Sequence, residues 1–161
     1  MTQKYPLSAL LWSFLVLVTS TIVPCLQAET KHCSTTDVAG KWAYTYTGNI
    51  VTGTTLLPAA AVGHYTTHPD GTLAGSQTRT VAGSSGEEDI AGTFTVNADC
   101  TGTATISVYV NGQLQRTTVL AVVYDNNMNH ARAIFQSVVL PDNTNIPVVI
   151  TSDNSRVFPR E

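Results

Sequence analysis

Apolar and polar residues alternate along most of the chain after residue 39, and this period of two is the pattern of β-strands. The clearest case is residues 90–110, where two alternating runs flank a polar turn at residues 97–102. Asn111 and Gly112 form the strongest short hairpin signal in the chain. The pattern predicts eight strands, at residues 40–46, 59–67, 72–81, 88–96, 103–110, 113–124, 130–140 and 146–152.

Eight short strands joined by hairpin-length turns indicate an all-β fold, either a sandwich or an up-and-down barrel. Parallel pairing needs long crossover connections, and the chain offers none. Residues 48–58 have no clear period and are expected to form the longest connection. We therefore predict an eight-stranded antiparallel up-and-down β-barrel.

The register of the central hairpin follows from its apolar residues. Pairing Val96 with Ala104 places Phe94 opposite Ile106, and it brings the apolar residues of both strands to one face. The same register pairs Ile90 with Val110. A slip of one residue would set this face against the threonines, so the pattern opposes it.

The N-terminal 28 residues have the pattern of a secretory signal peptide. Lys4 precedes an uncharged apolar run at residues 9–18, and Leu26 and Ala28 suit the −3 and −1 positions of a cleavage site. The apolar run is shorter than the roughly 20 residues that span a bilayer as a helix. We expect a secreted or periplasmic protein without stable membrane insertion, whose mature domain is residues 29–161.

Cleavage after Ala28 would remove Cys25 and leave Cys33 and Cys100. An even pair of cysteines in an exported chain favours a disulfide. In a meander the second, fourth and sixth strands return to the end at which the first strand starts. The turn that holds Cys100 therefore lies where Cys33 enters, and we predict a bridge between them.

Composition and charge exclude several classes of partner. Only 12% of residues are charged and the net charge is −3, so the clustered basic residues of a nucleic-acid interface are missing. His64 and His68 share a face of one strand but stand about 13 Å apart at the usual rise, too far for one metal ion. The sequence predicts no nucleic-acid partner, no metal and no cofactor.

Aromatic and apolar residues of the predicted strands are candidates for the wall of a ligand pocket. Trp42, Tyr44 and Tyr46 share one face of the first strand. The predicted wall residues are Tyr44, Tyr46, Phe94 and Ile106, whereas Trp42 is expected to be structural. The alternative is an ordinary filled core, because small eight-stranded barrels can be packed by their own side chains.

Two charged residues are candidates for a polar anchor inside such a pocket. Glu88 lies near the start of the fourth strand, and Arg79 lies near the end of the third. If Glu88 or the neighbouring Asp89 points inward with Arg79, that carboxylate could be a polar anchor for a ligand or an acid in a cyclase-like site. The alternative is a solvated strand end, in which Arg79 makes only a cross-strand pair.

Three features of this sequence resemble lipocalins. Gly40, Lys41 and Trp42 match the Gly-x-Trp that opens the first strand of that family, and residues 122–135 resemble the segment of its sixth and seventh strands. Arg156 falls roughly where lipocalins have an arginine that follows the eighth strand and lies over the Trp. The resemblance implies a cup-shaped barrel that binds a small apolar molecule. It also implies that Trp42 packs across the closed end with Arg156 over it.

The match to lipocalins is partial. Asp125 stands without the Thr and Tyr that usually flank it, and the long C-terminal helix of the family is missing. In lipocalins the first connection forms a lid over the mouth, which residues 48–58 would supply here. Allene oxide cyclase-like and dirigent-like barrels are also eight-stranded, and they remain the alternative resemblance.

Three functions therefore follow from the sequence. The first is non-covalent binding of a small, mostly apolar molecule, and this is the function that the lipocalin-like pattern favours. The second is a barrel cyclase or isomerase in which Glu88 or Arg79 takes part. The third is a barrel with a filled interior that acts through its surface.

Overall fold

A computed structural model describes residues 32–159, and the statements below concern these residues. The predicted signal peptide, residues 1–28, and its cleavage site lie outside the described residues. One 3-10 turn, η1 at Asn126–Met128, is the only helical element of the described part.

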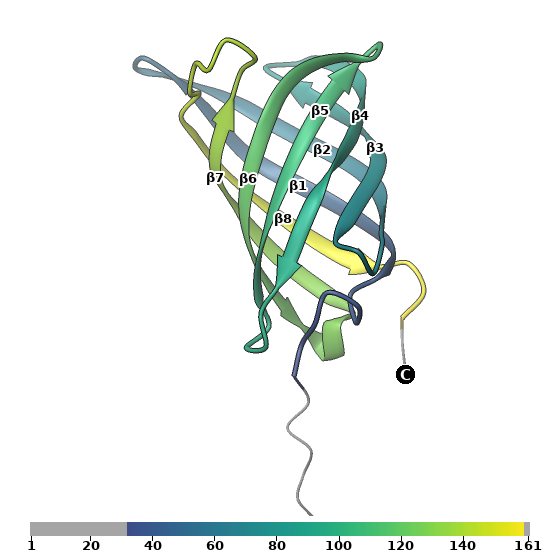
Figure 1. Cartoon of the computed structure of the whole chain (residues 1–161). Helices are drawn as coiled ribbons and strands as arrows, with labels where there is room; N and C mark the ends of the chain where they lie inside the picture. Colours follow the sequence, from purple (N-terminus) through teal and green to yellow (C-terminus); the bar gives the residue numbers. More distant parts are fainter. Residues whose placement is uncertain (1–31, 160–161) are drawn as a thin grey trace, which may run out of the picture. The chain divides into compact units, whose positions relative to one another are not determined.

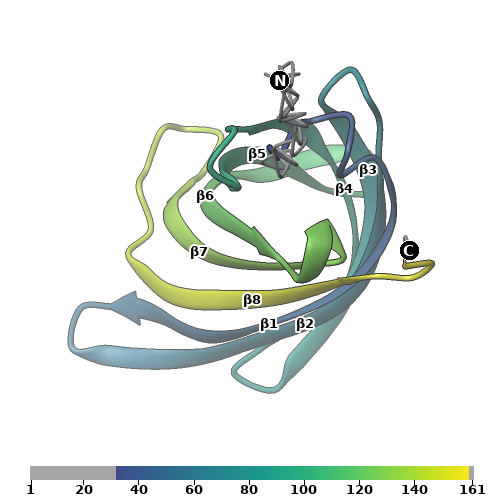
Figure 2. The ribbon, with the colours of Figure 1, turned by 90° about the horizontal axis from the view of Figure 1, so that it is seen from below.

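Eight antiparallel strands follow one another around a closed barrel, and the last strand pairs with the first. Figure 1 shows the strands inclined across the barrel, and Figure 2 shows them closing into a ring. The predicted all-β, up-and-down barrel is thus confirmed. The strands are β1 Gly40–Thr52, β2 Thr55–Thr67, β3 Thr72–Val81, β4 Ser84–Val96, β5 Thr101–Val110, β6 Gln113–Asp125, β7 His130–Val139 and β8 Val148–Arg156.

The predicted long loop at residues 48–58 is wrong, because β1 and β2 continue through it as a hairpin. Thr52 pairs with Thr55, and the intervening turn uses Gly53 at a φ of 58°. Pro58 fits because its carbonyl faces Ala82, just past the end of β3, and accepts a hydrogen bond from that backbone N–H. The missing N–H of Pro58 therefore costs no ladder bond to β1. The chain has no lid at this position.

The register of the central hairpin differs from the prediction by two residues. Phe94 pairs with Ala104 and Ile90 pairs with Val108, because β5 begins at Thr101 and the turn before it is tighter than expected. A shift of two residues keeps every side chain on its predicted face. The apolar face was therefore predicted correctly and the pairing was not.

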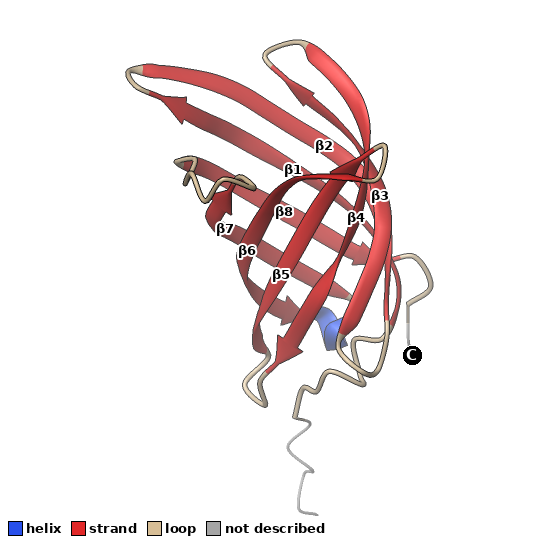
Figure 3. Cartoon of the chain, turned by 45° about the horizontal axis from the view of Figure 1, so that its top comes forward, coloured by secondary structure: helices blue, strands red, loops and turns tan. Residues whose placement is uncertain are grey.

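The strand ends define two different ends of the barrel. The segment that enters β1, the β2–β3, β4–β5 and β6–β7 turns and the end of β8 lie at one end, here called the closed end. The opposite end, here called the mouth, carries the β1–β2, β3–β4 and β5–β6 turns and the longer connection at residues 140–147. Figure 3 shows η1 at the closed end and the β7–β8 connection at the other.

A disulfide and a buried tryptophan hold the closed end. Cys33 and Cys100 are bonded with their Cα atoms 5.0 Å apart, which confirms the predicted bridge. Trp42 is only 1% exposed, and its indole Nε1 donates a hydrogen bond of 3.0 Å to the carbonyl of Val38. Tyr65 stacks against the indole, with ring centroids 6.3 Å apart.

Arg156 completes the closed end. Its Cζ lies 4.9 Å from the centre of the Trp42 ring, which is the contact that the resemblance to lipocalins implies. The guanidinium also donates to the carbonyls of Ala39 and Asp37, at 2.7 and 2.8 Å. Arg156 is the last residue of β8 rather than a residue beyond it. The guanidinium ties the entering segment to the barrel wall.

Candidate functional site

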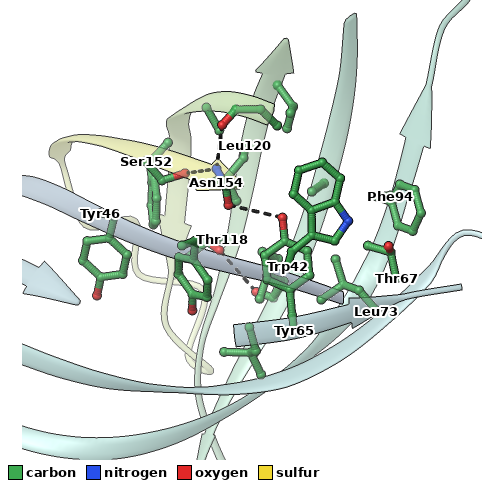
Figure 4. Close-up of a pocket in the computed structure, with 18 of the residues that line it drawn as sticks. Trp42, Tyr46, Tyr65, Thr67, Leu73, Phe94, Thr118, Leu120, Ser152 and Asn154 are labelled. Carbon is green, nitrogen blue, oxygen red and sulfur yellow. Dashed lines mark hydrogen bonds between the residues drawn. The ribbon is translucent and has the colours of Figure 1, made fainter. Parts of the chain in front are cut away.

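A cavity of about 70 Å³ lies in the barrel interior and is called the inner cavity here. Its lining is mostly apolar and aromatic, and Figure 4 shows a part of it that includes Trp42, Phe94 and Leu120. The four predicted wall residues Tyr44, Tyr46, Phe94 and Ile106 all line it. Trp42 also lines it, at the closed end. The period-two pattern thus identified side chains that face a shared space.

A second space of about 260 Å³ lies toward the mouth and is called the mouth pocket here. Tyr46, Phe135 and Arg116 line both spaces, so they form the partition between them. The rings of Tyr46 and Phe135 meet edge to face, with centroids 5.4 Å apart. The apolar lining of the mouth pocket comes from Ile50, Phe135, Val138, Leu140, Ile146, Val148 and Ile150.

A chain of polar side chains crosses the interior beside these spaces. The hydroxyl of Tyr44 donates to Gln77 Oε1 at 2.6 Å, and Gln77 Nε2 donates to Glu88 Oε2 at 2.5 Å. Arg116 then binds both oxygens of Glu88, at 2.7 and 2.5 Å. Gln77, Glu88 and Arg116 are all buried. The carboxylate is held by a two-pronged, charge-assisted contact of the strongest kind.

The strand pairing explains why these residues meet. Tyr44 pairs with Gly63, Gly63 with Gln77, and Gln77 with Glu88, so the four positions form one row across β1 to β4. Gly63 matters because a Cβ there would lie 2.8 Å from the Tyr44 ring and 2.8 Å from Gln77 Cβ. The bare backbone of Gly63 lets the Tyr44 ring pass over β2 to reach Gln77.

The environment keeps Glu88 ionised and the tyrosines protonated. Burial would raise the pKa of Glu88, but the hydrogen bonds and charge of Arg116, the hydrogen bond from Gln77 and the charge of Arg79 together outweigh burial and leave that pKa lowered. Burial raises the pKa of both Tyr44 and Tyr46. For Tyr46 the guanidiniums of Arg79 and Arg116 oppose this rise without cancelling it. Both hydroxyls are therefore hydrogen-bond donors at neutral pH.

Arg79 stands apart from this network. Its Nη1 lies 3.6 Å from Glu88 Oε1, longer than a hydrogen bond, and its side chain is 21% exposed. It lines the mouth pocket but not the inner cavity. Glu88 points inward and lies near Arg79, but it lines neither the inner cavity nor the mouth pocket, so its role as a ligand anchor stays a prediction. Asp89 points outward and is exposed.

Sequence reasoning missed Gln77 and Arg116, the two residues that bind Glu88. Both signals were present in the strand parity. Arg116 shares the inward face of β6 with Thr118, Leu120 and Val122, and Gln77 has the same parity on β3 as Leu73. A polar residue on an otherwise apolar inward face indicates a buried network, because it needs a partner there.

A second polar cluster lies beside this network, where the rings of Tyr65 and Tyr44 meet edge to face. Tyr65 donates to Asn154 Oδ1 at 3.2 Å, and Asn154 Nδ2 donates to the carbonyl of Ala131 and to Ser152 Oγ (Figure 4). Within residues 32–159 no group of His, Cys, Asp and Glu is arranged to hold a metal ion. The same residues contain no helix with the length and apolar character of a membrane span.

Comparisons with known proteins return nothing for this chain: no protein-family model, no curated protein and no solved structure matches it. The eight-stranded closed antiparallel barrel fits a calycin-like architecture in its layout. Function therefore has to be argued from the site.

Proposed function

We propose that this protein binds a small, mostly apolar molecule inside its barrel. The observation that carries the proposal is the apolar and aromatic inner cavity, with the mouth pocket directly above it. Concave, mostly apolar spaces with a few placed polar groups are the usual form of small-molecule sites. Here the polar groups of the inner cavity include Tyr44, Gln77 and Arg116, which belong to the Glu88 network, and Asn154, which does not.

The sizes of the two spaces limit the ligand. Pockets for drug-sized ligands have volumes of about 300–1,000 Å³. The inner cavity alone, at about 70 Å³, holds only a small fragment, whereas the mouth pocket of about 260 Å³ is near the lower limit. A ligand body of about ten non-hydrogen atoms fits the mouth pocket, and movement of Tyr46 or Phe135 would join it to the inner cavity.

Burial of apolar ligand surface supplies the affinity in this proposal. Each 100 Å² removed from water contributes roughly 2.5 kcal/mol, part of which is offset by the lost freedom of the ligand. Closure of the barrel at the other end by Trp42 and Arg156 leaves the mouth as the route of entry. We also propose that the protein works in an exported compartment, where the Cys33–Cys100 bridge persists.

The enzymatic alternative receives less support from the same residues. A general acid has to hold a proton near neutral pH, which usually requires a raised pKa. Arg116 lowers the pKa of Glu88 and occupies both of its oxygens. Glu88 is therefore placed to orient other groups rather than to donate a proton.

Binding of naphthalene, a neutral fluorescent dye of the size that the mouth pocket holds, tests the proposal. We expect saturable binding by the mature protein, and its loss in Ile50→Trp, because Ile50 lines the mouth pocket and an indole would fill it. Val149→Trp is the matched control, since Val149 is 64% exposed on the outer face of the same end. Equal binding by both variants, or none by the wild-type protein, would overturn the proposal.

A filled barrel that acts through its surface is the second candidate. Two observations favour it: the inner cavity is small, and large apolar side chains are exposed outside, among them Val62, Val149 and Phe158 at 60, 64 and 71%. Absence of dye binding by the wild-type protein, with no small molecule in its native mass spectrum after purification from its own host, would select this candidate.

A further inference from the structure

We infer that the ligand carries a single carboxylate, which Arg79 binds at the floor of the mouth pocket with help from the Tyr46 hydroxyl. This inference rests on the proposed function and names the chemical class of ligand. It would place the anionic group on the arginine and the apolar body against the walls formed by β1, β7 and β8.

The first argument is a surplus of positive charge. Two guanidiniums, those of Arg79 and Arg116, line the mouth pocket, and among the described residues no acidic side chain lines it. The nearest carboxylate, Glu88, is already engaged through both oxygens by Arg116. Arg79 also pairs with Glu88, at 3.6 Å and without a hydrogen bond, so two guanidiniums share one carboxylate and a net charge of one positive unit is left over.

The second argument is the setting of that charge. The other side chains around the mouth pocket are apolar except for Tyr46 and Gln115. A charge held among apolar groups is costly unless an opposite charge joins it. An anion that enters the pocket meets this charge where water is partly excluded, and there the attraction is stronger than at the surface.

The third argument selects a carboxylate. The planar guanidinium presents paired N–H donors that match the two oxygens of a carboxylate. Tyr46 lies in the same pocket beside Arg79, and its buried hydroxyl keeps its proton and can donate to the same group. One surplus guanidinium and one hydroxyl suit one carboxylate on an apolar body.

A comparison of octanoate with octan-1-ol tests this inference. The two probes share the same apolar chain and differ in charge, and both are small enough for the mouth pocket. By isothermal titration calorimetry at about pH 7.5, we expect octanoate to bind the mature protein about 10- to 100-fold more tightly than octan-1-ol, as a charge-assisted contact predicts.

Arg79→Met tests the residue itself, because it keeps an apolar stem and removes the charge. We expect it to lose the preference for octanoate and to bind octan-1-ol as well as before. Arg132→Met is the matched control, since it removes one positive charge from a side chain that is 72% exposed on the outer face. This control should bind octanoate like the wild-type protein.

The outcomes separate the two proposals. If the wild-type protein binds the neutral dye and octan-1-ol but shows no preference for octanoate, this inference fails and the proposed function stands. If it binds none of the three, the proposed function fails. Should Arg79→Met not fold, Arg79→Lys serves in its place. Lysine keeps the positive charge but lacks the paired N–H donors of the guanidinium, and we expect it to bind octanoate about tenfold more weakly. Equal binding of octanoate by wild type and either Arg79 variant would overturn the inference.

Discussion

The two ends of the barrel each bury arginine, and they treat it in opposite ways. At the closed end Arg156 donates to backbone carbonyls and packs over Trp42, with Met128 supplying a further carbonyl. Near the mouth Arg116 is paired with Glu88, and Arg79 is close to the same carboxylate without a hydrogen bond to it. The first arrangement fastens chain segments together. The second sets a charged group in a pocket.

Under the proposed function, this difference separates the residues that hold the fold from those that meet a ligand. A buried ion pair is weak evidence for stability, because well-packed apolar residues of similar volume are often as stable or more so. The closed end uses a disulfide and hydrogen bonds to the backbone, which restrain the fold directly. We therefore expect closed-end substitutions to change stability without changing ligand affinity, and mouth substitutions to change both.

The largest effect is expected from removal of the disulfide. Cys33→Ser combined with Cys100→Ser opens a loop of 67 residues, and the chain-entropy relation gives a loss of about 4 kcal/mol in the free energy of unfolding. Urea titration followed by tryptophan fluorescence measures it. Dithiothreitol should destabilise the wild-type protein and leave the double variant unchanged. Dye affinity that falls along with stability, under conditions where the variant is folded, would break the distinction between the two ends.

The second largest effect is expected from Arg116→Met. This substitution should lower the free energy of unfolding by about 3 kcal/mol, because it leaves the Glu88 carboxylate buried without its main partner. The pKa of Glu88 should then rise, since Arg116 makes the largest contribution that opposes the effect of burial on it. Chemical denaturation gives the free energy, and carboxyl ¹³C shifts against pH follow the carboxylate.

The control for that substitution removes both partners. The double variant Glu88→Leu and Arg116→Met should recover most of the lost stability, because no buried charge of the pair is left uncompensated. If the double variant is as unstable as Arg116→Met alone, the loss in the free energy of unfolding comes from packing rather than from an uncompensated charge. The Glu88–Arg116 pair would then stabilise the fold, as the contacts of the closed end do.

The wild-type Glu88 also gives a pH dependence. Its folded pKa is lowered below the unfolded value, so its contribution to stability is present above about pH 4.5 and is lost as pH falls through the folded pKa. The wild-type protein should therefore lose stability below about pH 4.5 more steeply than the double variant. Parallel curves for the two proteins would contradict this origin of the acid sensitivity.

Gly63→Ala should cost about 1–3 kcal/mol, since the added methyl would meet the backbone oxygen of Ser76 and the ring of Tyr44. It should also break the hydrogen bond from Tyr44 to Gln77. Thermal unfolding measures the cost. Gly86→Ala is the matched control, because nothing lies within 4 Å of a Cβ at that position of β4 and its change should stay within about 0.5 kcal/mol. Equal losses in both variants would show that strand propensity, not the row across β1 to β4, sets the effect.

The alternation of apolar and polar residues predicted which face of a strand each side chain occupies, but it did not predict which residues pair across two strands. Strand parity placed Phe94 and Ile90 inside correctly, because a face is fixed by odd and even positions. The same parity cannot distinguish registers that differ by two, so Val108 rather than Val110 opposes Ile90. The disulfide was predictable because a meander fixes which turns share an end, whatever the register.

The candidate site was predictable in its walls and not in its connections. Tyr44 and Tyr46 were found as inward aromatic residues of one strand. The network beyond Tyr44 runs through Gln77 of β3 to Glu88 of β4 and Arg116 of β6, so it exists only once these strands are paired in register. The hairpin at residues 48–58 was missed because Gly and Pro usually interrupt strands. Here Gly53 lies in the turn, and Pro58 lies in β2 at a point where its neighbour, Ala82, is already past the end of β3.

The smallest effect is expected outside the barrel, at a histidine between two carboxylates. His130 Nδ1 lies 2.5 Å from Asp125 and Nε2 lies 2.9 Å from Asp153, while Arg132 also contacts Asp125. Burial would lower the pKa of His130, but the hydrogen bonds and charges of Asp153 and Asp125 outweigh it and leave the pKa raised.

A raised folded pKa means that the stabilisation is complete below about pH 6.5 and is lost as pH rises through the folded value. His130→Gln should therefore cost about 0.5 kcal/mol at about pH 5.5 and less at about pH 8.5, the size of an exposed pair. Urea midpoints at the two pH values measure this, and a cost that grows with pH would show that the imidazole acts through packing rather than charge.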